Sequence, residues 1–263
     1  ATSLGLGAQQ ASSGLLYLFG IPNNLLSQIL VIIFITIIAI FSVFKGLDKG
    51  VRLLSNINIG LASILLLFVI MAGPTYQIIS SYGEILFSYF QDITRLSNWN
   101  RSADLEWYRD WTIFYWAWWI SWSPFVGMFI ARISKGRTIR EFLSVAMFVP
   151  LIFSLIWFSS FGQTAIFQFQ EGVGELSKPV SEISLILFYM LDNLFFPALT
   201  SIFALLMLVL FFVTSSDSGS LVMNTITSGG KEDTPRIQRL IWAAIQGLIA
   251  IVLLVGGGSY ALS

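Results

Sequence analysis

Long apolar stretches constrain this chain more than any other feature of its sequence. A bilayer core about 30 Å thick requires about 20 apolar residues in a helix that crosses it. Seven stretches approach or reach that length, near residues 3–20, 23–44, 53–73, 111–133, 140–162, 194–216 and 237–257. The first is the least apolar, because glycines and glutamines dilute it, and helices of this kind pack inside a bundle. The sequence therefore predicts an all-α membrane protein with about seven transmembrane helices in one domain, residues 1–263.

The composition agrees with a membrane protein and excludes several functions. Only 11% of the 263 residues are charged, against roughly 25% in a soluble domain. The 14 basic and 14 acidic residues cancel, so we expect no nucleic-acid partner. The chain has no Cys and no His, which removes thiol nucleophiles, imidazole bases and His/Cys zinc sites. We therefore expect a transporter or a structural subunit, and not an enzyme.

The basic residues indicate how the chain is oriented. Ten of the 14 follow the second, fourth and sixth stretches, namely Lys45, Lys49, Arg52, Arg132, Lys135, Arg137, Arg140, Lys231, Arg236 and Arg239. Their three loops share one side if the helices alternate, and the positive-inside rule makes that side cytoplasmic. Most acidic residues, including Asp104, lie on the opposite loops. Since the chain begins at Ala1 inside an apolar stretch that is no signal peptide and ends soon after another apolar stretch, we expect an internal piece of a longer protein.

The segment 75–97 is too polar to cross a membrane but is patterned as a helix. After Gly73 and Pro74, apolar residues recur at steps of three and four: Ile78, Ile79, Tyr82, Ile85, Leu86, Tyr89, Phe90, Ile93 and Leu96. This pattern is typical of an amphipathic helix in the membrane interface or at an oligomer contact. A helix that only covers the ends of its neighbours would show the same pattern.

Aromatic residues line one side of the fourth stretch. At 100° per residue, six of them fall within an arc of roughly 80°: Trp111, Phe114, Trp118, Trp122, Phe125 and Phe129. Belts at the headgroup level explain Trp111 but not the deeper Trp118, Trp119 and Trp122. Ring faces attract a quaternary ammonium group, so a cation site and ordinary packing both remain open here. Pro124 removes the backbone bond to Ile120 and is expected to leave that carbonyl free at mid-span.

Hydroxyl side chains lie at the end of the sixth stretch. Thr214 and Ser215 offer hard oxygen ligands, which suit an alkali cation. They could equally bond back to carbonyls one turn earlier and bend the helix. Asp217 is the only carboxylate near the interior of a span. It is either functional or it meets the cytoplasmic interface or pairs with Arg236. An intramembrane protease would need a His beside Ser, or two such acids, and the chain offers neither.

At these residues the sequence resembles the betaine/choline/carnitine transporter family. The stretch DWTIFYWAWW, Asp110 to Trp119, and the loop ARISKGRTIREF, Ala131 to Phe142, match the family's pattern almost letter for letter. The run from Ser3 to Ala8, the Thr214-Ser215 pair with Asp217, and the ending from Gly256 to Ser263 are also similar. The resemblance implies a leucine-transporter-like fold of twelve spans with two inverted repeats, of which this chain covers the fifth to the eleventh. It also implies a homotrimer in the bacterial plasma membrane, with the 78–96 helix forming the trimer.

The resemblance further implies a role for each aromatic and hydroxyl position. Trp118, Trp119 and Trp122 would hold a trimethylammonium group, with Phe114 and Phe129 as aromatic gates. Phe211, Thr214 and Ser215 would belong to one sodium site, and Phe125 would flank a second. The implied function is import of glycine betaine by sodium symport for osmotic protection. Choline, dimethylsulfoniopropionate and ectoine remain open as substrates, proton coupling remains open, and a structural membrane subunit is the alternative outside transport.

Overall fold

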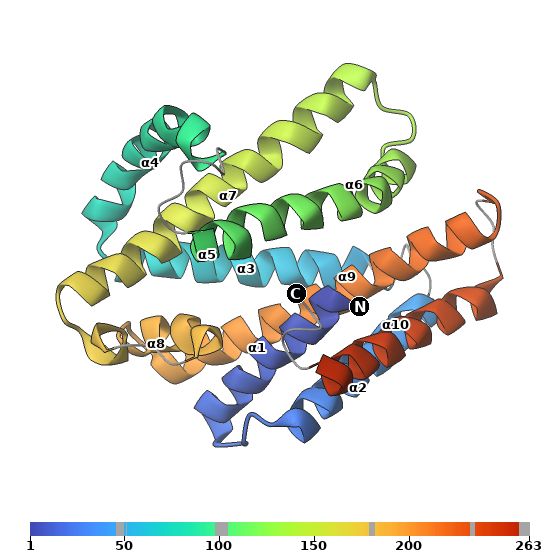
Figure 1. Cartoon of the computed structure of the whole chain (residues 1–263), viewed down its shortest axis with the longest axis horizontal. Coiled ribbons are helices and arrows are strands. Elements are labelled where there is room, and N and C mark those ends of the chain that lie inside the picture. The colour runs from blue at the N-terminus through green and yellow to red at the C-terminus, as the bar shows by residue number, and fades with distance from the viewer. Residues whose placement is uncertain (46–49, 51, 98–104, 179–181, 232–234, 258–263) are drawn as a thin grey trace. The chain divides into compact units, whose positions relative to one another are not determined.

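The structure is a computed structural model that describes residues 1–45, 50, 52–97, 105–178, 182–231 and 235–257. Within these ranges every regular element is a helix (Figure 1). The helices are α1 (Thr2–Phe19), α2 (Leu25–Lys45), α3 (Arg52–Ala72), α4 (Thr75–Leu96), α5 (Leu105–Trp107), α6 (Phe114–Ile133), α7 (Ile139–Gln170), α8 (Ile186–Asp192), α9 (Pro197–Thr227) and α10 (Arg236–Gly257). A π-helical segment, Tyr108–Ile113, joins α5 to α6, and two short 3-10 turns, Gly174–Ser177 and Ile183–Leu185, precede α8. The predicted all-α class is confirmed.

Five of the described helices are long and apolar enough to cross a membrane. They are Leu25–Val43, Arg52–Ala72, Ile139–Gln170, Pro197–Thr227 and Ile237–Gly256, and they match five of the seven predicted spans. The other two predicted spans, 3–20 and 111–133, are helical as α1 and α6 but less apolar. Glycine, serine and glutamine lower the hydropathy of α1, and the polar tips of Trp and Tyr lower that of α6. Lys49, Asp104 and the family-like ending after Gly257 lie outside the described residues.

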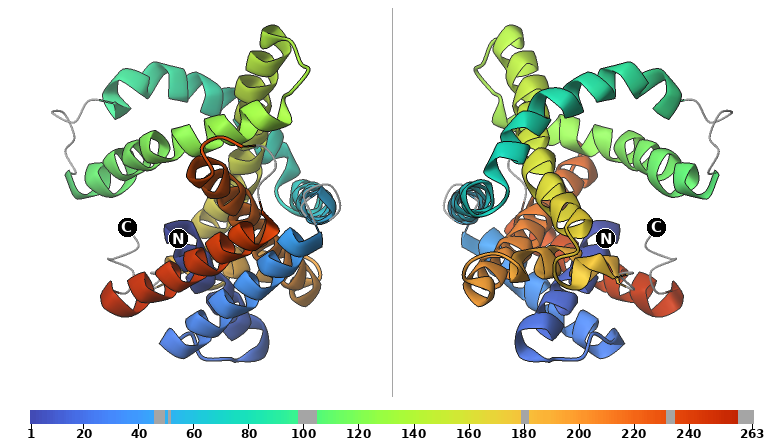
Figure 2. Two further views of the ribbon diagram at one scale, coloured as in Figure 1. Left: turned by 90° about the vertical axis from the view of Figure 1, so that its right-hand side faces the viewer. Right: turned by 90° about the vertical axis from the view of Figure 1, so that its left-hand side faces the viewer.

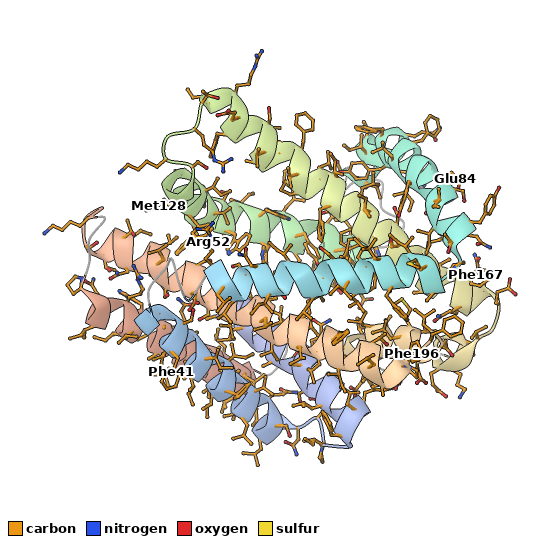
Figure 3. The ribbon with its side chains drawn as sticks, turned by 180° about the vertical axis from the view of Figure 1, so that it is seen from behind. Phe41, Arg52, Glu84, Met128, Phe167 and Phe196 are labelled. Carbon is orange, nitrogen blue, oxygen red and sulfur yellow. The ribbon has the colours of Figure 1, made fainter. Side chains whose placement is uncertain are left out.

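Helix α9 is longer than its apolar stretch predicts, because its polar residues continue the helix to Thr227. It begins at Pro197, a residue suited to the first turn, where no backbone N–H donor is needed. Phe196 precedes it with φ at 56°, the left-handed region (Figure 3). Past the predicted end at residue 216, hydroxyls bond back to carbonyls of the preceding turn, as Ser218 does to Thr214 and Thr225 to Leu221. These bonds give each hydroxyl an acceptor that lipid could not supply.

The chain divides into two compact units, residues 1–73 with 165–263 and residues 74–164. In the first unit α2 and α10 run side by side (Figures 1 and 2). Small residues allow this close approach, since Ala39 of α2 and Ala243 and Ala250 of α10 are fully buried. A Cβ atom at Gly247 of α10 would overlap the side chain of Thr36 on α2. Contact of this kind, through small residues, is how helices associate in a membrane.

Helix α1 packs along α9 in the same unit, again through glycines. A Cβ atom at Gly7 would overlap the ring of Phe212 on α9. A Cβ atom at Gly14 would lie 2.5 Å from Cζ of Phe188 on α8, the short helix that precedes α9. Both rings are buried. The prediction that the Gly-rich first stretch packs inside a bundle is therefore confirmed, although it is not among the five most apolar helices.

The end of α1 carries a set of polar contacts that sequence analysis did not predict. The hydroxyls of Ser13 and Ser184 lie 2.7 Å apart, and the amide of Asn23 donates to Ser13 at 2.9 Å. The hydroxyl of Tyr17 donates to the carboxylate of Asp192 at 2.5 Å, and its ring stacks on Phe188 with centroids 5.7 Å apart. These contacts attach the segment before α9 to α1. The partners are about 170 residues apart in sequence, so no local pattern marks them.

The second unit contains α4, α5, the π-helical segment, α6 and most of α7. The helix predicted over 75–97 is present as α4. Ile78 and Ser81 are buried, and the hydroxyl of Tyr82 lies 3.3 Å from that of Ser160 on α7. Leu96 is half-buried, and the other large apolar side chains of α4 are exposed, namely Tyr76, Ile79, Ile85, Leu86, Phe87, Tyr89, Phe90 and Ile93. Its place in the membrane interface or at a trimer contact stays a prediction.

Candidate functional site

Helix α6 carries the predicted aromatic arc. The π-helical segment leads directly into it, and such segments often occur at functional sites. Trp111 stacks on Tyr115, with ring centroids 6.0 Å apart and planes 7° from parallel. The deeper rings do not stack in this way: the centroids of Phe114 and Trp118 lie 5.6 Å apart with the planes tilted by 59°. Trp119 and Trp122 meet edge to face at 6.0 Å. This geometry leaves ring faces available to a third group.

The two sides of α6 differ in burial. Phe114, Trp118, Phe125 and Phe129, all on the arc, are half-buried. Trp116, on the opposite side of the helix, is 62% exposed. Trp122 at the edge of the arc is 42% exposed, and Trp119 just beyond it is 60% exposed. The arc is therefore the more enclosed side of α6, and Trp119 is the least enclosed of the predicted substrate residues.

The prediction for the carbonyl of Ile120 is wrong. Pro124 does remove the backbone donor, and α6 continues through the proline. The carbonyl of Ile120 is not free, however, because the hydroxyl of Ser123 donates a hydrogen bond to it at 3.0 Å. A side chain of the same turn thus replaces the lost backbone bond.

On α9 the structure brings three predicted sodium residues into one turn. The hydroxyl of Thr214 donates to the carbonyl of Phe211 at 2.9 Å, and Ser215 is half-buried beside it. The back-bonding alternative is thus present at Thr214. It does not exclude ion binding, since both oxygens keep lone pairs. Phe125, the fourth predicted residue, lies on α6 in the other unit.

The donor set on α9 fits a hard monovalent cation in its chemistry. Carbonyl and hydroxyl oxygens are the ligands that such cations prefer, and two of them lie within 3 Å of each other here. Among the residues that the structure describes, no group of three or more His, Cys, Asp or Glu side chains could hold a metal ion. The neutral oxygens of Phe211, Thr214 and Ser215 are therefore the candidate ion ligands.

Asp217 is buried inside the first unit. Asp217 is 1% exposed. The hydroxyl of Ser42 on α2 donates a hydrogen bond to the Oδ2 atom of Asp217 at 2.5 Å. Whether Asp217 lies at the depth of the cytoplasmic interface stays open, and the side chain of Arg236 lies outside the described residues. Sequence analysis missed Ser42; its only signal is a hydroxyl within an otherwise apolar run of α2.

Comparison with known proteins identifies the family of the chain. The whole chain, residues 1–263, matches the family model for betaine/carnitine/choline family transporters. It is 49% identical over 262 residues to glycine betaine transporter 1 of Vibrio parahaemolyticus serotype O3:K6 (strain RIMD 2210633), a match that covers 99% of the chain and 50% of that protein. It is 45% identical over 265 residues to the glycine betaine transporter OpuD of Bacillus subtilis (strain 168), covering 100% of the chain and 51% of that protein.

A further relative has a broader name. The glycine betaine/proline/choline/ectoine transporter of the same Vibrio strain is 49% identical over 264 residues, covering 100% of the chain and 47% of that protein. The chain thus spans about half the length of the curated relatives it matches. These relatives are named as transporters and not as enzymes. Because one family model matches every residue, the chain belongs to the betaine/carnitine/choline transporter family and is a multi-pass integral membrane protein.

Proposed function

We propose that the complete protein imports glycine betaine, or a close quaternary ammonium solute, across a bacterial plasma membrane by sodium symport. The single observation that carries this proposal is the half-buried aromatic arc of α6, with Trp118 at its centre. The names of the relatives support the substrate class. Accumulation of such a solute would protect the cell against osmotic stress.

The aromatic arc suits a cation that has no hydrogen-bond donor. A trimethylammonium group cannot be held by carbonyl or carboxylate hydrogen bonds, but the negative face of an indole attracts it by about 2 kcal/mol or more when water is excluded. The tilted pair Phe114–Trp118 and the edge-to-face pair Trp119–Trp122 leave such faces open. In this proposal Trp118, Trp119 and Trp122 bind the ammonium group, and Phe114 and Phe129 lie along its pathway.

In this proposal sodium ions bind to α9 and couple uptake of the substrate to the sodium gradient. The carbonyl of Phe211 and the hydroxyls of Thr214 and Ser215 would ligate one ion, and Phe125 would flank a second. An ion shifts a conformational equilibrium only by its different affinity for the two states. Ligands on α9 meet this requirement if their partners on another helix approach in one state and withdraw in the other.

The direct test is uptake of labelled glycine betaine by the full-length protein in proteoliposomes. We expect uptake with an inward sodium gradient and little uptake when potassium replaces sodium at equal ionic strength. Uptake driven by a proton gradient without sodium would refute sodium symport and favour the proton-coupled alternative. Competition by choline, proline and ectoine then measures how broad the substrate range is.

Substitution at Thr214 tests the ion site separately from the substrate site. Thr214→Ala removes an oxygen ligand, so we expect the sodium concentration for half-maximal uptake to rise by about tenfold, as the loss of one good polar contact implies. The betaine concentration for half-maximal uptake at saturating sodium should change little. Thr225→Ala is the matched control, because Thr225 lies on the same helix and its hydroxyl makes the same kind of bond, to Leu221. Equal sodium curves for both variants would contradict the assignment.

We also propose that the protein forms a homotrimer through α4. This helix keeps large apolar side chains exposed along most of its length, including both of its phenylalanines, Phe87 and Phe90. Apolar patches of this kind mark contacts with protein or lipid. A second and third copy of the chain would cover them.

A further inference from the structure

A phenylalanine ring lies within the turn of α9 that carries the proposed sodium ligands, Phe211 to Ser215. Phe212 directly follows Phe211, whose carbonyl is one proposed ligand, and it precedes Ser215, another, by three residues. Residues three apart are neighbours on a helix surface. Phe212 therefore shares a face of α9 with Ser215, although the side chain of Phe212 is not itself a proposed ligand.

Helix α1 encloses this ring. Phe212 is 9% exposed, and α1 packs against α9 (Figure 1). A Cβ atom at Gly7 of α1 would overlap the Cε1, Cε2 and Cζ atoms of Phe212, which form the outer end of the ring. The ring thus lies directly against the backbone of α1. Only a residue without a side chain leaves room for the ring in this position.

The inner contacts of the ring connect it to the proposed ligands. The rings of Phe211 and Phe212 meet edge to face, with centroids 5.4 Å apart and planes 81° from parallel. Val213, the next residue, is fully buried. The carbonyl of Phe211 accepts the hydroxyl of Thr214 at 2.9 Å, so these two oxygens depend on the same stretch of backbone. Displacement of the Phe212 ring therefore disturbs the part of α9 that would hold the ion.

The size of the disturbance follows from the overlap at Gly7. Carbon atoms prefer a separation of about 3.5–4.0 Å, so a methyl group at Gly7 would displace the Phe212 ring by about 1 Å or more. A binding site requires its ligands to be held within about 0.5 Å of the productive geometry. Since the ring is buried and contacts Phe211, it has little free space to enter. We therefore expect part of the displacement to reach the ligand turn.

We propose that Gly7 and Phe212 are positioning residues for sodium: the ring of Phe212, packed on the backbone of α1 at Gly7, fixes the turn from Phe211 to Ser215 against α1. The inference rests on the proposed sodium coupling and adds two residues outside the ligand set. If the contact served packing alone, its loss would lower the stability of the protein without changing sodium affinity.

Two glycines of α1 allow positioning and packing to be separated. Gly7→Ala displaces the ring of Phe212, and the double variant Gly7→Ala/Phe212→Leu makes room for the new methyl group. Gly14→Ala is the matched control, because its Cβ atom would lie 2.5 Å from Cζ of Phe188 and 3.1 Å from Cδ1 of Leu205. Phe188 lies on α8, and Leu205 precedes the ligand turn on α9. Both alanine variants overpack α1, but only Gly7→Ala acts on a ring within the ligand turn.

The experiment measures equilibrium binding of radioactive sodium to the purified full-length protein, together with sodium-dependent betaine uptake in proteoliposomes. We expect Gly7→Ala to raise the half-saturating sodium concentration by about tenfold, as much as the loss of one good polar contact. The double variant should return it to within about threefold of wild type. The betaine concentration for half-maximal uptake at saturating sodium should change little in either variant. Gly14→Ala should bind sodium as wild type does, at a temperature where all variants are folded.

Three results would overturn the proposal. Wild-type sodium affinity in a folded Gly7→Ala protein would show that the contact does not position the ligands. Equal weakening by Gly14→Ala would show a general effect of overpacking α1. A double variant as weak as Gly7→Ala would show that the effect does not pass through the Phe212 ring.

Two further outcomes are decisive. If Gly7→Ala does not fold, the single variant Phe212→Leu replaces it: sodium binding weakened by about threefold, as the loss of part of a packing contact implies, supports the proposal, and wild-type affinity refutes it. Absence of any sodium binding by the wild type would instead refute the proposed symport, and the inference with it.

Discussion

Replacing Gly14 by alanine tests the close packing of α1. The new Cβ atom would lie 2.5 Å from Cζ of Phe188 and 3.1 Å from Cδ1 of Leu205. Carbon atoms prefer a separation of about 3.5–4.0 Å, so the Phe188 ring must move by about 1 Å or more. That ring is fully buried and stacks on Tyr17, so it has no free space to enter.

The expected loss of stability follows from two opposing effects. Overpacking of a buried site costs about 1–3 kcal/mol, whereas Gly→Ala within a helix gains up to about 1 kcal/mol. With a gain of about 1 kcal/mol the net loss is about 0–2 kcal/mol, and at about 2–4 °C per kcal/mol for a domain of 150–250 residues this corresponds to a fall of up to about 8 °C in apparent melting temperature. Gly60→Ala on α3 is the matched control, since nothing lies within 4 Å of its Cβ position; it should be neutral or slightly stabilising.

Tryptophan fluorescence during heating of the purified full-length protein measures both variants. The double variant Gly14→Ala/Phe188→Leu should recover part of the loss, because the smaller side chain makes room for the new methyl group. If Gly14→Ala melts at the same temperature as Gly60→Ala, then Phe188 does not lie against Gly14, and the proposed packing of α1 against the segment before α9 is refuted.

Three further predictions concern the substrate site, the oligomer and the polar contacts of α1. Trp118→Ala should raise the betaine concentration for half-maximal uptake by about tenfold or more, through loss of one ring face; an equal effect of Trp116→Ala, on the opposite side of α6, would contradict the assignment. If the proposed trimer forms through α4, Phe90→Glu should lower the molar mass measured by light scattering after gel filtration to that of a monomer, and an unchanged mass would exclude α4 from the contact. Tyr17→Phe keeps the ring but removes the bond to Asp192, and should lower the free energy of unfolding by about 1 kcal/mol; melting at the wild-type temperature would show that the bond contributes nothing.

Local patterns predicted most of the helices. The bounds of α2, α3 and α10 lie within two residues of the predicted spans, because each span is predominantly apolar over the length that a membrane crossing requires. The amphipathic α4 was predicted from its spacing of three and four residues. The extension of α9 to Thr227 was not, because hydropathy falls at Thr214 while the helix continues through side-chain bonds such as that of Ser218.

Contacts between distant segments could not be predicted. Ser42 and Asp217 are 175 residues apart, as are Tyr17 and Asp192, and nothing near either residue in the sequence identifies its partner. The proposed site also has one part that the local sequence predicts and another that it does not. The turn from Phe211 to Ser215 follows from helix periodicity, whereas the family resemblance, and not spacing alone, connects it to the aromatic residues of α6.

The hydrogen bond from Ser123 to Ile120 determines whether α6 depends on its neighbours at the proline. Proline-interrupted helices often borrow a donor from an adjacent helix or from water, and their geometry then depends on that neighbour. Here the donor belongs to the same turn. The carbonyl of Ile120 is thus satisfied within α6 itself, and its hydrogen bond does not depend on where a neighbouring helix lies.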